Sequence, residues 1–453
     1  MTLTVNPRRP VAGAPREYHF PPFQKHSLSN GLTVWLVPLE DRSLVNVHLL
    51  VDAGAAAETE PHGGVASLTA QLLVTGTRRL DANEFAEATE RLGIEVSSES
   101  SWDSARAAFQ AVPEHLVDGL DLLAEMILEP RFDAGEFERL RAERLADIMQ
   151  ARADAGGLAD ERFLASLYDE STPYRRVAAG RPETVEALTL DTVRAFHAAA
   201  YRPAGSHLIV AGRFDPDPLL AAVERVLGAW HGEAGGHRTV VPQPAERRRR
   251  VVIVDRPGSV QSELRVGHGG IDRYDSRFFP GLVMAAMLGG VFGSRLNLRL
   301  REELGYTYGA RAGFDPRRSA GPFIASAAVQ TEVTAPALTE LLAQVDGIRA
   351  AVVPEAELRD VKDFLIGIFP LRFETTAGVA AALEPLAVYG LADDWWSSYR
   401  DQLEAVDVVA AHDAANDLIV PEELLILVVG DASRIRAEIE ALALGPVEVT
   451  TAD

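Results

Sequence analysis

The side chains that most often bind metals or act as nucleophiles are sparse in this chain. It has no cysteine, which excludes thiolate catalysis, disulfides and Cys-ligated metal sites. None of its eleven histidines lies four residues from another, so no imidazole pair can share one helical face. His412 and Asp413 are adjacent, but their Ala-rich helical stretch has no second cluster, which indicates a surface pair. We also find no Gly-x-Ser-x-Gly elbow and no paired-carboxylate cluster.

Polar chemistry is concentrated in the segment 289–313, which reads GGVFGSRLNLRLREELGYTYGARAG. Gly289, Gly290 and Gly293 predict a tight turn between two helices, and no Lys-Ser or Lys-Thr follows them to make a phosphate-binding loop. The second helix carries arginines, and tyrosines follow it. Guanidinium and phenol groups both donate hydrogen bonds and act best where negative charge develops. From composition alone, solvated arginines and half-packed tyrosines would be the preferred interpretation.

A second segment, GGVASLTAQLLVTGT at residues 63–77, places two glycines before a short helix and Thr-Gly-Thr after it. Its flanks resemble those of the zinc helix of the pitrilysin/insulinase superfamily, which includes mitochondrial processing peptidase. The resemblance implies that in active members this helix carries His-x-x-Glu-His. The two histidines lie one turn apart and bind zinc, and the glutamate activates the metal-bound water.

The zinc ligands themselves are missing from this segment. Ser67 stands where the first histidine would be, Ala70 replaces the glutamate, and Gln71 replaces the second histidine. The family's third ligand, a glutamate in a long helix, falls by spacing at or near Asp147. A hydroxyl, an amide and one carboxylate are a poor ligand set for zinc, and alanine cannot accept a proton. We therefore expect no metal in this chain, and a buried helix whose small residues face the domain interior.

The segment 289–313 resembles the family's Gly-rich loop, its following helix, and an Arg–Tyr pair seven residues apart. The resemblance implies that this pair reaches from a second domain towards a zinc site, holds the substrate carbonyl and stabilises the oxyanion. Arg301 with Tyr308 follows the shorter bacterial members, and Arg299 with Tyr306 follows the long single-chain members. We favour Arg301 and Tyr308 as the catalytic donors and expect the three glycines to contribute to substrate binding.

Strands and helices are predicted around both segments from the spacing of apolar and β-branched residues. The predicted strands are 32–39, 44–54, 94–102, 104–112, 251–257 and 262–271. The predicted helices are 64–73, 81–92, 114–152 with a break near Pro130, 280–290, 296–305 and 335–351. Trp395 and Trp396 are interpreted as core or interface packing.

The ends of the two halves repeat one plan. Residues 201–228 and 419–442 each run from a proline through an apolar strand, a glycine and an acidic turn into a helix. Such self-similarity indicates a duplicated domain. We predict an α+β fold of two homologous domains, 20–228 and 251–447, each a mixed or antiparallel sheet packed with helices. A linker at 229–250 joins them, and the first twenty residues form a tail. The resemblance, which spans His26 to Leu442, implies the same fold.

Composition restricts the partners of this chain of 453 residues. It has 44 basic and 66 acidic residues, hence a net charge of −22. Nucleic acid and anionic membranes both need local basic surface and are disfavoured. The four arginines at 247–250 are interpreted as a solvated strand entry. With no apolar run of about 18 residues and no signal-like core at the N-terminus, we expect a cytoplasmic protein that spans no membrane.

These observations and the resemblance lead to one functional expectation. The chain would be the non-catalytic subunit of a heterodimeric zinc peptidase, inactive alone, supplying Arg301 and Tyr308 to a homologous partner that holds the zinc on an intact His-x-x-Glu-His. An extended peptide substrate would add to a sheet edge near the metal. The alternative is a catalytically inert structural or peptide-binding scaffold.

Overall fold

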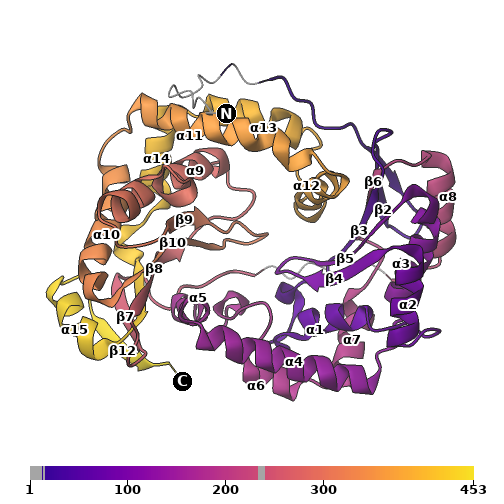
Figure 1. Cartoon of the computed structure of the whole chain (residues 1–453), viewed down its shortest axis with the longest axis horizontal. Helices are drawn as coiled ribbons and strands as arrows, with labels where there is room; N and C mark the ends of the chain where they lie inside the picture. The colour runs from indigo at the N-terminus through magenta and orange to yellow at the C-terminus, as the bar shows by residue number, and fades with distance from the viewer. Residues whose placement is uncertain (1–12, 14–15, 233–239, 453) are drawn as a thin grey trace, which may run out of the picture.

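The computed structural model describes Gly13, residues 16–232 and residues 240–452. Residues 1–12, 14–15, 233–239 and 453 lie outside it, and with them most of the predicted tail and part of the predicted linker. The described residues form two six-stranded sheets, one in each half of the chain (Figure 1).

The strands of the first half are β1 (Gln24–Ser27), β2 (Thr33–Pro38), β3 (Val45–Val51), β4 (Glu95–Ser100), β5 (Ala105–Ala111) and β6 (His207–Gly212). Its helices are α1 (Val65–Leu73), α2 (Ala82–Leu92), α3 (Leu116–Leu128), α4 (Ala134–Ala153), α5 (Ala155–Leu167), α6 (Pro182–Ala187), α7 (Leu190–Ala200) and α8 (Pro216–Leu227).

The strands of the second half are β7 (Arg250–Asp255), β8 (Gln261–Gly269), β9 (Ala310–Phe314), β10 (Pro322–Gln330), β11 (Leu425–Gly430) and β12 (Val447–Thr451). Its helices are α9 (Phe278–Ala285), α10 (Thr334–Ala350), α11 (Glu355–Ile368), α12 (Thr376–Tyr389), α13 (Trp395–Ala405), α14 (Val408–Leu418) and α15 (Ala432–Ala441). Two π-helical segments, η5 (Ala286–Gly290) and η6 (Asn297–Glu303), complete the Gly-rich region.

The two sheets share one topology. Their strand orders are β1-β2-β6-β3-β5-β4 and β12-β7-β11-β8-β10-β9. β2 is parallel to β6 as β7 is to β11, and the next pairings outward to β4 and β9 are antiparallel in both sheets. Only the first strand of each order differs, since β1 pairs antiparallel and β12 parallel. The prediction of two homologous α+β domains is confirmed.

Local sequence signals set the ends of the elements around the first site. Asp81 and Glu84 form the capping box that begins α2, and Gly93 ends it in the left-handed conformation at φ +62°. The predicted break near Pro130 separates α3 from α4. These ends agree with the helix predicted at 81–92 and with the interruption of the helical stretch at 114–152.

The two halves exchange helices. α12, from the second half, packs on β3 and β6 of the first sheet, and α5, from the first half, packs on β8 and β11 of the second sheet (Figure 1). Each of these helices follows another α-helix, α4 or α11, so the exchange obeys the internal duplication. Because both faces of the inner strands are covered, every residue of β3 and β11 is buried. Sequence analysis had assigned neither α5 nor α12.

Apolar packing dominates both exchange contacts. Leu158 and Phe163 of α5 share a buried cluster with Val252, Leu427 and other residues of β7 and β11. At the α12 contact, hydrogen bonds also fix the position of the helix on the sheet. Asn46 Nδ2 of β3 donates to Thr376 Oγ1 of α12 at 2.7 Å. There, too, the Glu384 carboxylate lies 2.6 Å from a ring nitrogen of His48 and accepts from Arg106 at 3.0 Å.

The loop between β9 and β10 also inserts into the first half. The guanidinium of Arg317 stacks 4.8 Å from Trp102 and 4.4 Å from Tyr174. Arg318 Nη1 donates to Asp52 at 2.8 Å, and its backbone N–H donates to Asp103 at 3.0 Å. In Figure 1 this hairpin points from the second sheet towards β4 and β5.

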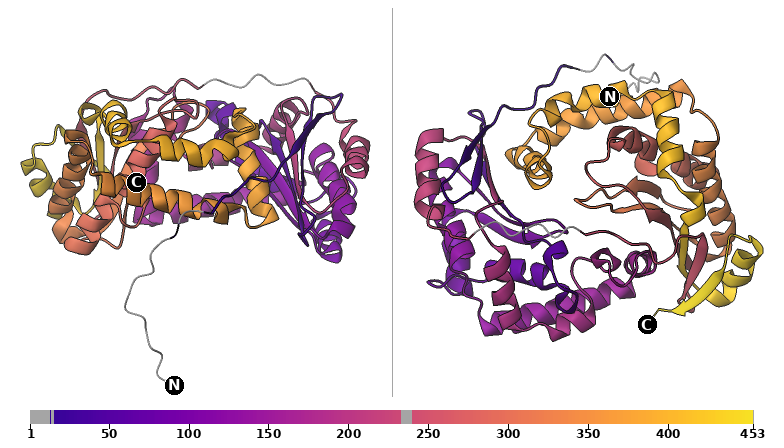
Figure 2. Two further views of the ribbon diagram at one scale, coloured as in Figure 1. Left: turned by 90° about the horizontal axis from the view of Figure 1, so that it is seen from above. Right: turned by 180° about the vertical axis from the view of Figure 1, so that it is seen from behind.

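The described part of the tail crosses to the second half. Figure 2 shows this segment running along the second half. Tyr18 stacks on Phe373 at 5.6 Å, and Phe20 meets the same ring edge-on at 5.1 Å and lies 6.4 Å from Trp396. Trp396 is buried in the core, as predicted, and donates to the carbonyl of Ala382 at 2.7 Å. The tail therefore straps the two domains together.

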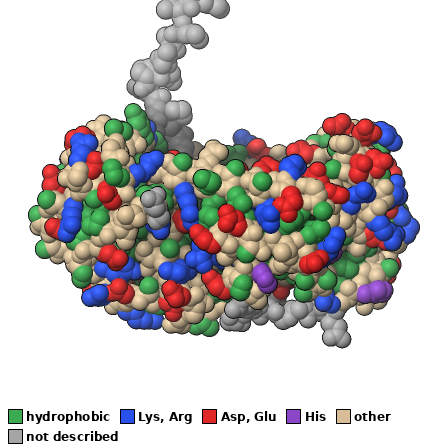
Figure 3. Space-filling view, turned by 90° about the horizontal axis from the view of Figure 1, so that it is seen from below, with side chains coloured by type: hydrophobic (Ala, Val, Ile, Leu, Met, Phe, Trp, Pro, Cys, Tyr) green, Lys and Arg blue, Asp and Glu red, His purple; other side chains and the backbone are tan. Residues whose placement is uncertain are grey.

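The arginines at 247–250 lie among acidic groups. Arg248 and Arg250 pair with Glu246, and Arg247 pairs with Glu423. Lys and Arg side chains are interspersed with Asp and Glu over the face drawn in Figure 3. Across the described ranges, no single helix is long and apolar enough to cross a membrane; 355–373 and 376–389 meet that requirement only together, across a 112° bend.

Truncating Phe163 tests the helix exchange. Its side chain is fully buried between the halves, so Phe163→Ala should cost about 3–5 kcal/mol in the free energy of urea unfolding. Amide hydrogen exchange should show lower protection in both β3 and β11. The helix exchange couples the two sheets, so weakening the cover of one should destabilise the other. Met149→Ala, on exposed α4 surface, should change stability by less than about 0.5 kcal/mol. Loss of protection in β11 alone would contradict this coupling.

Candidate functional site

The helix predicted to correspond to the zinc helix is α1. Ala70 is fully buried, and Ser67 and Gln71 are partly buried. The interpretation of α1 as a buried helix with small residues facing inward therefore agrees with the structure. Asp147, on the neighbouring helix α4, is exposed.

A cation stands beside the position where zinc would be held. Arg144, one turn before Asp147 on α4, donates from Nη2 to Ser67 Oγ at 3.0 Å. A guanidinium at that distance repels a divalent cation, and serine, glutamine and alanine offer no strong ligand. Within the described ranges no three His, Asp or Glu side chains gather to hold a metal. The residues present at α1 do not fit zinc.

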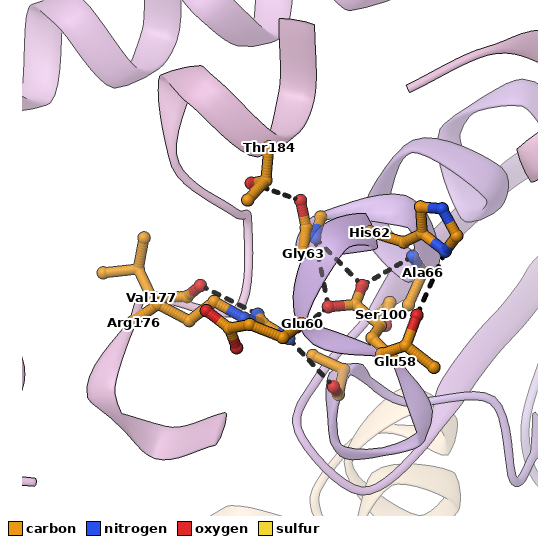
Figure 4. A network of polar contacts seen from close by, with 12 residues as sticks. Glu58, Glu60, His62, Gly63, Ala66, Ser100, Arg176, Val177 and Thr184 are labelled. Carbon is orange, nitrogen blue, oxygen red and sulfur yellow. Dashed lines mark hydrogen bonds and ion pairs between the residues drawn. The ribbon is translucent and has the colours of Figure 1, made fainter. Parts of the chain in front are cut away.

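The N-terminus of α1 is organised around a buried carboxylate (Figure 4). Glu58, whose side chain is fully buried, accepts hydrogen bonds from the backbone N–H groups of Gly64 at 3.0 Å and Ala66 at 2.7 Å. Arg176 forms a buried ion pair with it and also donates to the carbonyl of Ala55. The carboxylate caps the helix and interacts favourably with the positive end of its dipole. The arginine supplies the compensating positive charge.

Burial opposes the charge on this group. Desolvation raises the pKa of Glu58 to about 6, despite the opposing effects of Arg176 and the two backbone donors. The carboxylate therefore binds its proton more tightly in the folded chain than in the unfolded chain, whose ordinary value is 4.5. Arg176 in turn lies 5.3 Å over Trp102, the ring that Arg317 of the second half also contacts.

The paired glycines before α1 are required because another backbone segment packs closely against them. Gly64 adopts φ +98°, and a Cβ there would lie 2.7 Å from the carbonyl oxygen of Ala179. The Gly63 carbonyl accepts from Thr184 Oγ1 at 2.7 Å. The segment before α6 thus packs directly on this turn, and the Gly-Gly signal reflects packing at the entrance of α1.

The predicted donor pair lies at the end of η6 and in the loop before β9. Tyr308 is 94% exposed. The guanidinium of Arg301 stacks 4.4 Å from the ring of Phe292, which is itself 66% exposed. Among the residues that the structure describes, Arg301 forms an ion pair only with its neighbour Glu302, at 3.5 Å. Both side chains are therefore accessible to another molecule.

The alternative register is used inside the chain. Arg299 donates to Glu340 at 2.8 and 3.0 Å and to Glu303 at 2.7 Å. These carboxylates, Glu340 first, raise the pKa of Arg299. Tyr306 packs against the core of the second half. Arg299 and Tyr306 thus have structural partners. Tyr308 is almost fully exposed, and the Arg301 side chain, 35% exposed, is as accessible as that of Arg299 at 37%.

Asn297, which sequence analysis did not single out, holds this loop. Its buried amide donates to the carbonyl of Ala310 and accepts from the N–H of the same residue, both at 2.9 Å. Its Nδ2 also donates to Ser294 Oγ at 3.1 Å. The clamp ties η6 to the first residue of β9, so the chain between them displays Tyr308 on a supported loop. An asparagine before a Gly-flanked loop was the only available sequence signal.

The three glycines divide into different roles. A Cβ on Gly289 would lie 2.3 Å from the backbone nitrogen of Ala312, so glycine is required where η5 crosses β9. Gly290 has ordinary space, and a Cβ on Gly293 would meet nothing within 4 Å. Packing accounts for Gly289, while Gly293 lies exposed between Phe292 and the start of η6. The predicted role of these glycines in substrate binding stays a prediction.

Comparison with known proteins agrees with this arrangement. Residues 35–176 match the family profile described as "Insulinase (Peptidase family M16)", and residues 187–365 match "Peptidase M16 inactive domain". The chain belongs to the M16 family. Within it, this chain is of the inactive type, since its α1 carries none of the metal ligands and its second half matches the inactive-domain profile.

Relatives of this M16 chain cover most of its length. It is 24% identical to the "Non-peptidase homolog YmxG" of Helicobacter pylori, over 82% of this chain and 87% of that one. It is 23% identical to the "Uncharacterized zinc protease YmxG" of Bacillus subtilis, over 78% and 85%. The crystal structure of a peptidase M16 inactive domain from Pseudomonas fluorescens superposes with a TM-score of 0.83 at 26% identity, covering 90% of this chain and 98% of that one.

Glu58→Gln tests the buried carboxylate. The amide turns a donor towards backbone N–H groups and leaves Arg176 without its charge partner, so we expect a loss of about 1–3 kcal/mol in unfolding free energy. Because the folded pKa exceeds the unfolded value, the proton linkage of Glu58 makes the wild type lose stability as pH rises from about 4.5 to about 6. That component should vanish in the variant, as measured by urea unfolding at each pH.

The matched control is Glu60→Gln. Glu60 pairs with Arg181 at the surface, so this variant should differ from wild type by less than about 1 kcal/mol and keep its pH profile. An unchanged wild-type profile in Glu58→Gln would show that Glu58 does not titrate in this range.

Proposed function

We propose that this M16 homologue is the non-catalytic subunit of a heterodimeric zinc metallopeptidase. Its partner is a homologous chain with an intact His-x-x-Glu-His, and Arg301 and Tyr308 act on the substrate held there. The observation that carries the proposal is that Tyr308 is exposed and Arg301 partly exposed on the second half, in a chain whose α1 lacks the residues to hold zinc.

The donor pair has the properties that such a role requires. A guanidinium stays charged at all working pH values, and a phenol donates one directed hydrogen bond. Stacking on Phe292 limits the freedom of Arg301, and the Asn297 clamp supports the loop of Tyr308. Donors that are held in place before the reaction stabilise a developing oxyanion at little reorganisation cost.

The surrounding surface suits a protein partner. Three large apolar side chains are exposed here: Phe292 by 66%, Leu298 by 47% and Tyr308 by 94%. They lie in the same segment, 292–308, as Arg301. Tyrosine and arginine are the residue types most enriched where protein interfaces bind tightly. Because the zinc in this proposal belongs to the partner, its bound water would be the nucleophile there, and this chain contributes hydrogen bonds to the peptide carbonyl.

A reconstitution experiment tests the proposal. The chain is assayed for peptide hydrolysis with zinc, alone and mixed with a homologue that carries an intact motif, sought first in the neighbouring gene. We expect activity only in the mixture, with loss on chelation. A stable complex without activity would favour the inert scaffold, and activity of this chain alone would contradict the reading of α1.

Substitution in the active mixture tests the two residues. Arg301→Ala and Tyr308→Phe should each lower kcat by about 10²–10³-fold, because each removes one oxyanion donor. Arg295→Ala is the matched control, since Arg295 is engaged with Glu357 at 2.6 Å and should leave turnover within a few-fold. Undiminished turnover in Arg301→Ala, with loss in Arg299→Ala, would establish the other register.

A further inference from the structure

The second half holds an apolar cavity of about 420 Å³ between α9, β9 and α11. Its size falls within the range of small-molecule sites, about 300–1,000 Å³. Apolar side chains such as Leu282, Phe314 and Ile368 form most of the wall. The charged residues that line it are Arg273 and Arg372, and no Asp or Glu does so. An acid-free, arginine-lined cavity is unexpected in a chain of net charge −22.

Arg273 lies in the segment between β8 and α9 and is held by stacking. Its guanidinium lies 4.2 Å from the ring of Phe278 and 5.0 Å from that of Trp395. Its backbone N–H donates to the carbonyl of Arg317 at 2.8 Å. These contacts leave the guanidinium little freedom, so little order is lost when it binds.

The partly buried guanidinium of Arg273 has no acidic partner among the described residues. Its Nε is buried without a hydrogen-bond partner, and among the described residues no carboxylate forms an ion pair with it. Burial lowers the pKa of Arg273, yet arginine remains charged. Arg277, four residues on, shows the ordinary arrangement, since it donates to Asp275 at 2.7 and 2.9 Å. A partly buried guanidinium without an acidic partner is favourably placed to bind an anion, which would complete its hydrogen bonds.

We propose that this cavity binds a small amphipathic acid, with its carboxylate on Arg273 and its apolar part among Leu282, Phe314 and Ile368. The planar guanidinium can hold both carboxylate oxygens, and the apolar wall removes the hydrocarbon from water. Arg372, exposed at the rim, adds a second positive charge. Two sources share this chemistry: a free medium-chain fatty acid and the apolar C-terminal residue of a peptide.

This site goes beyond the proposed function, because neither Arg301 nor Tyr308 lines the cavity. Its test uses the full chain alone, whereas the peptidase proposal needs the mixture. The failure of one therefore leaves the other standing.

Calorimetric titration tests the site with decanoate and, as the neutral comparison, decan-1-ol. We expect decanoate to bind more tightly by about 10- to 100-fold, the effect of a charge-assisted hydrogen bond. Arg273→Gln should remove this difference and leave decanol binding unchanged. Arg277→Gln is the matched control and should bind like wild type. The second arm compares an acetylated tripeptide ending in leucine with its C-terminal amide, and preference for the free acid would identify a peptide source.

A cavity-filling variant protects the test against misfolding of Arg273→Gln. Leu282 lines the cavity and is only partly buried, so Leu282→Trp enlarges a side chain that already lies in the wall and should fill the cavity. It should abolish binding of decanoate and decanol while the thermal unfolding midpoint is kept. Equal affinity for decanoate and decanol, no binding of either acid up to millimolar concentration, or full binding in Leu282→Trp would overturn the proposal.

Discussion

The exchange of α5 and α12 between the two halves is the contact on which the rest of the structure depends. A six-stranded sheet with apolar inner strands needs cover on both faces, and each half supplies the missing cover of the other. The β9–β10 loop and the tail then add contacts at the same junction. The halves are therefore homologous in fold but not independent in stability, and a change at one sheet is transmitted to the other through a packed helix.

This constraint explains why α1 keeps its shape without metal ligands. Its N-terminus is held by Glu58 and Arg176, and Arg176 stacks on Trp102, which also receives Arg317 from the second half. The helix is thus part of the junction between domains. Arg144 hydrogen-bonds to Ser67, so a guanidinium approaches the helix where the family's active members hold zinc. α1 therefore has a packing role that does not need metal ligands.

The second half shows how a packed region presents groups for chemistry. η6 has one side buried through Leu300, and its Arg299 is engaged by acidic groups, while Arg301 and Tyr308 project from the same turn and loop. β9 also lines a cavity whose arginines have no acid beside them in the wall. Both features concern the same short strand, which stands at the edge of its sheet.

Local patterns in the sequence were enough to predict the duplication, most strands, the capped helix α2, and the missing zinc ligands, because these follow from residue type and short spacing. The family resemblance added the Arg–Tyr pair, and residue spacing left its register open. The tertiary structure added that Arg299 is engaged by Glu340, on a helix 41 residues further along the chain, and the choice between the two registers stays a prediction. It also decided the exchange of α5 and α12, the buried Glu58–Arg176 pair and the cavity at Arg273. Each of these requires groups from distant segments to meet. The sequence shows a charged residue or an apolar helix face, but only the tertiary structure shows what packs against it.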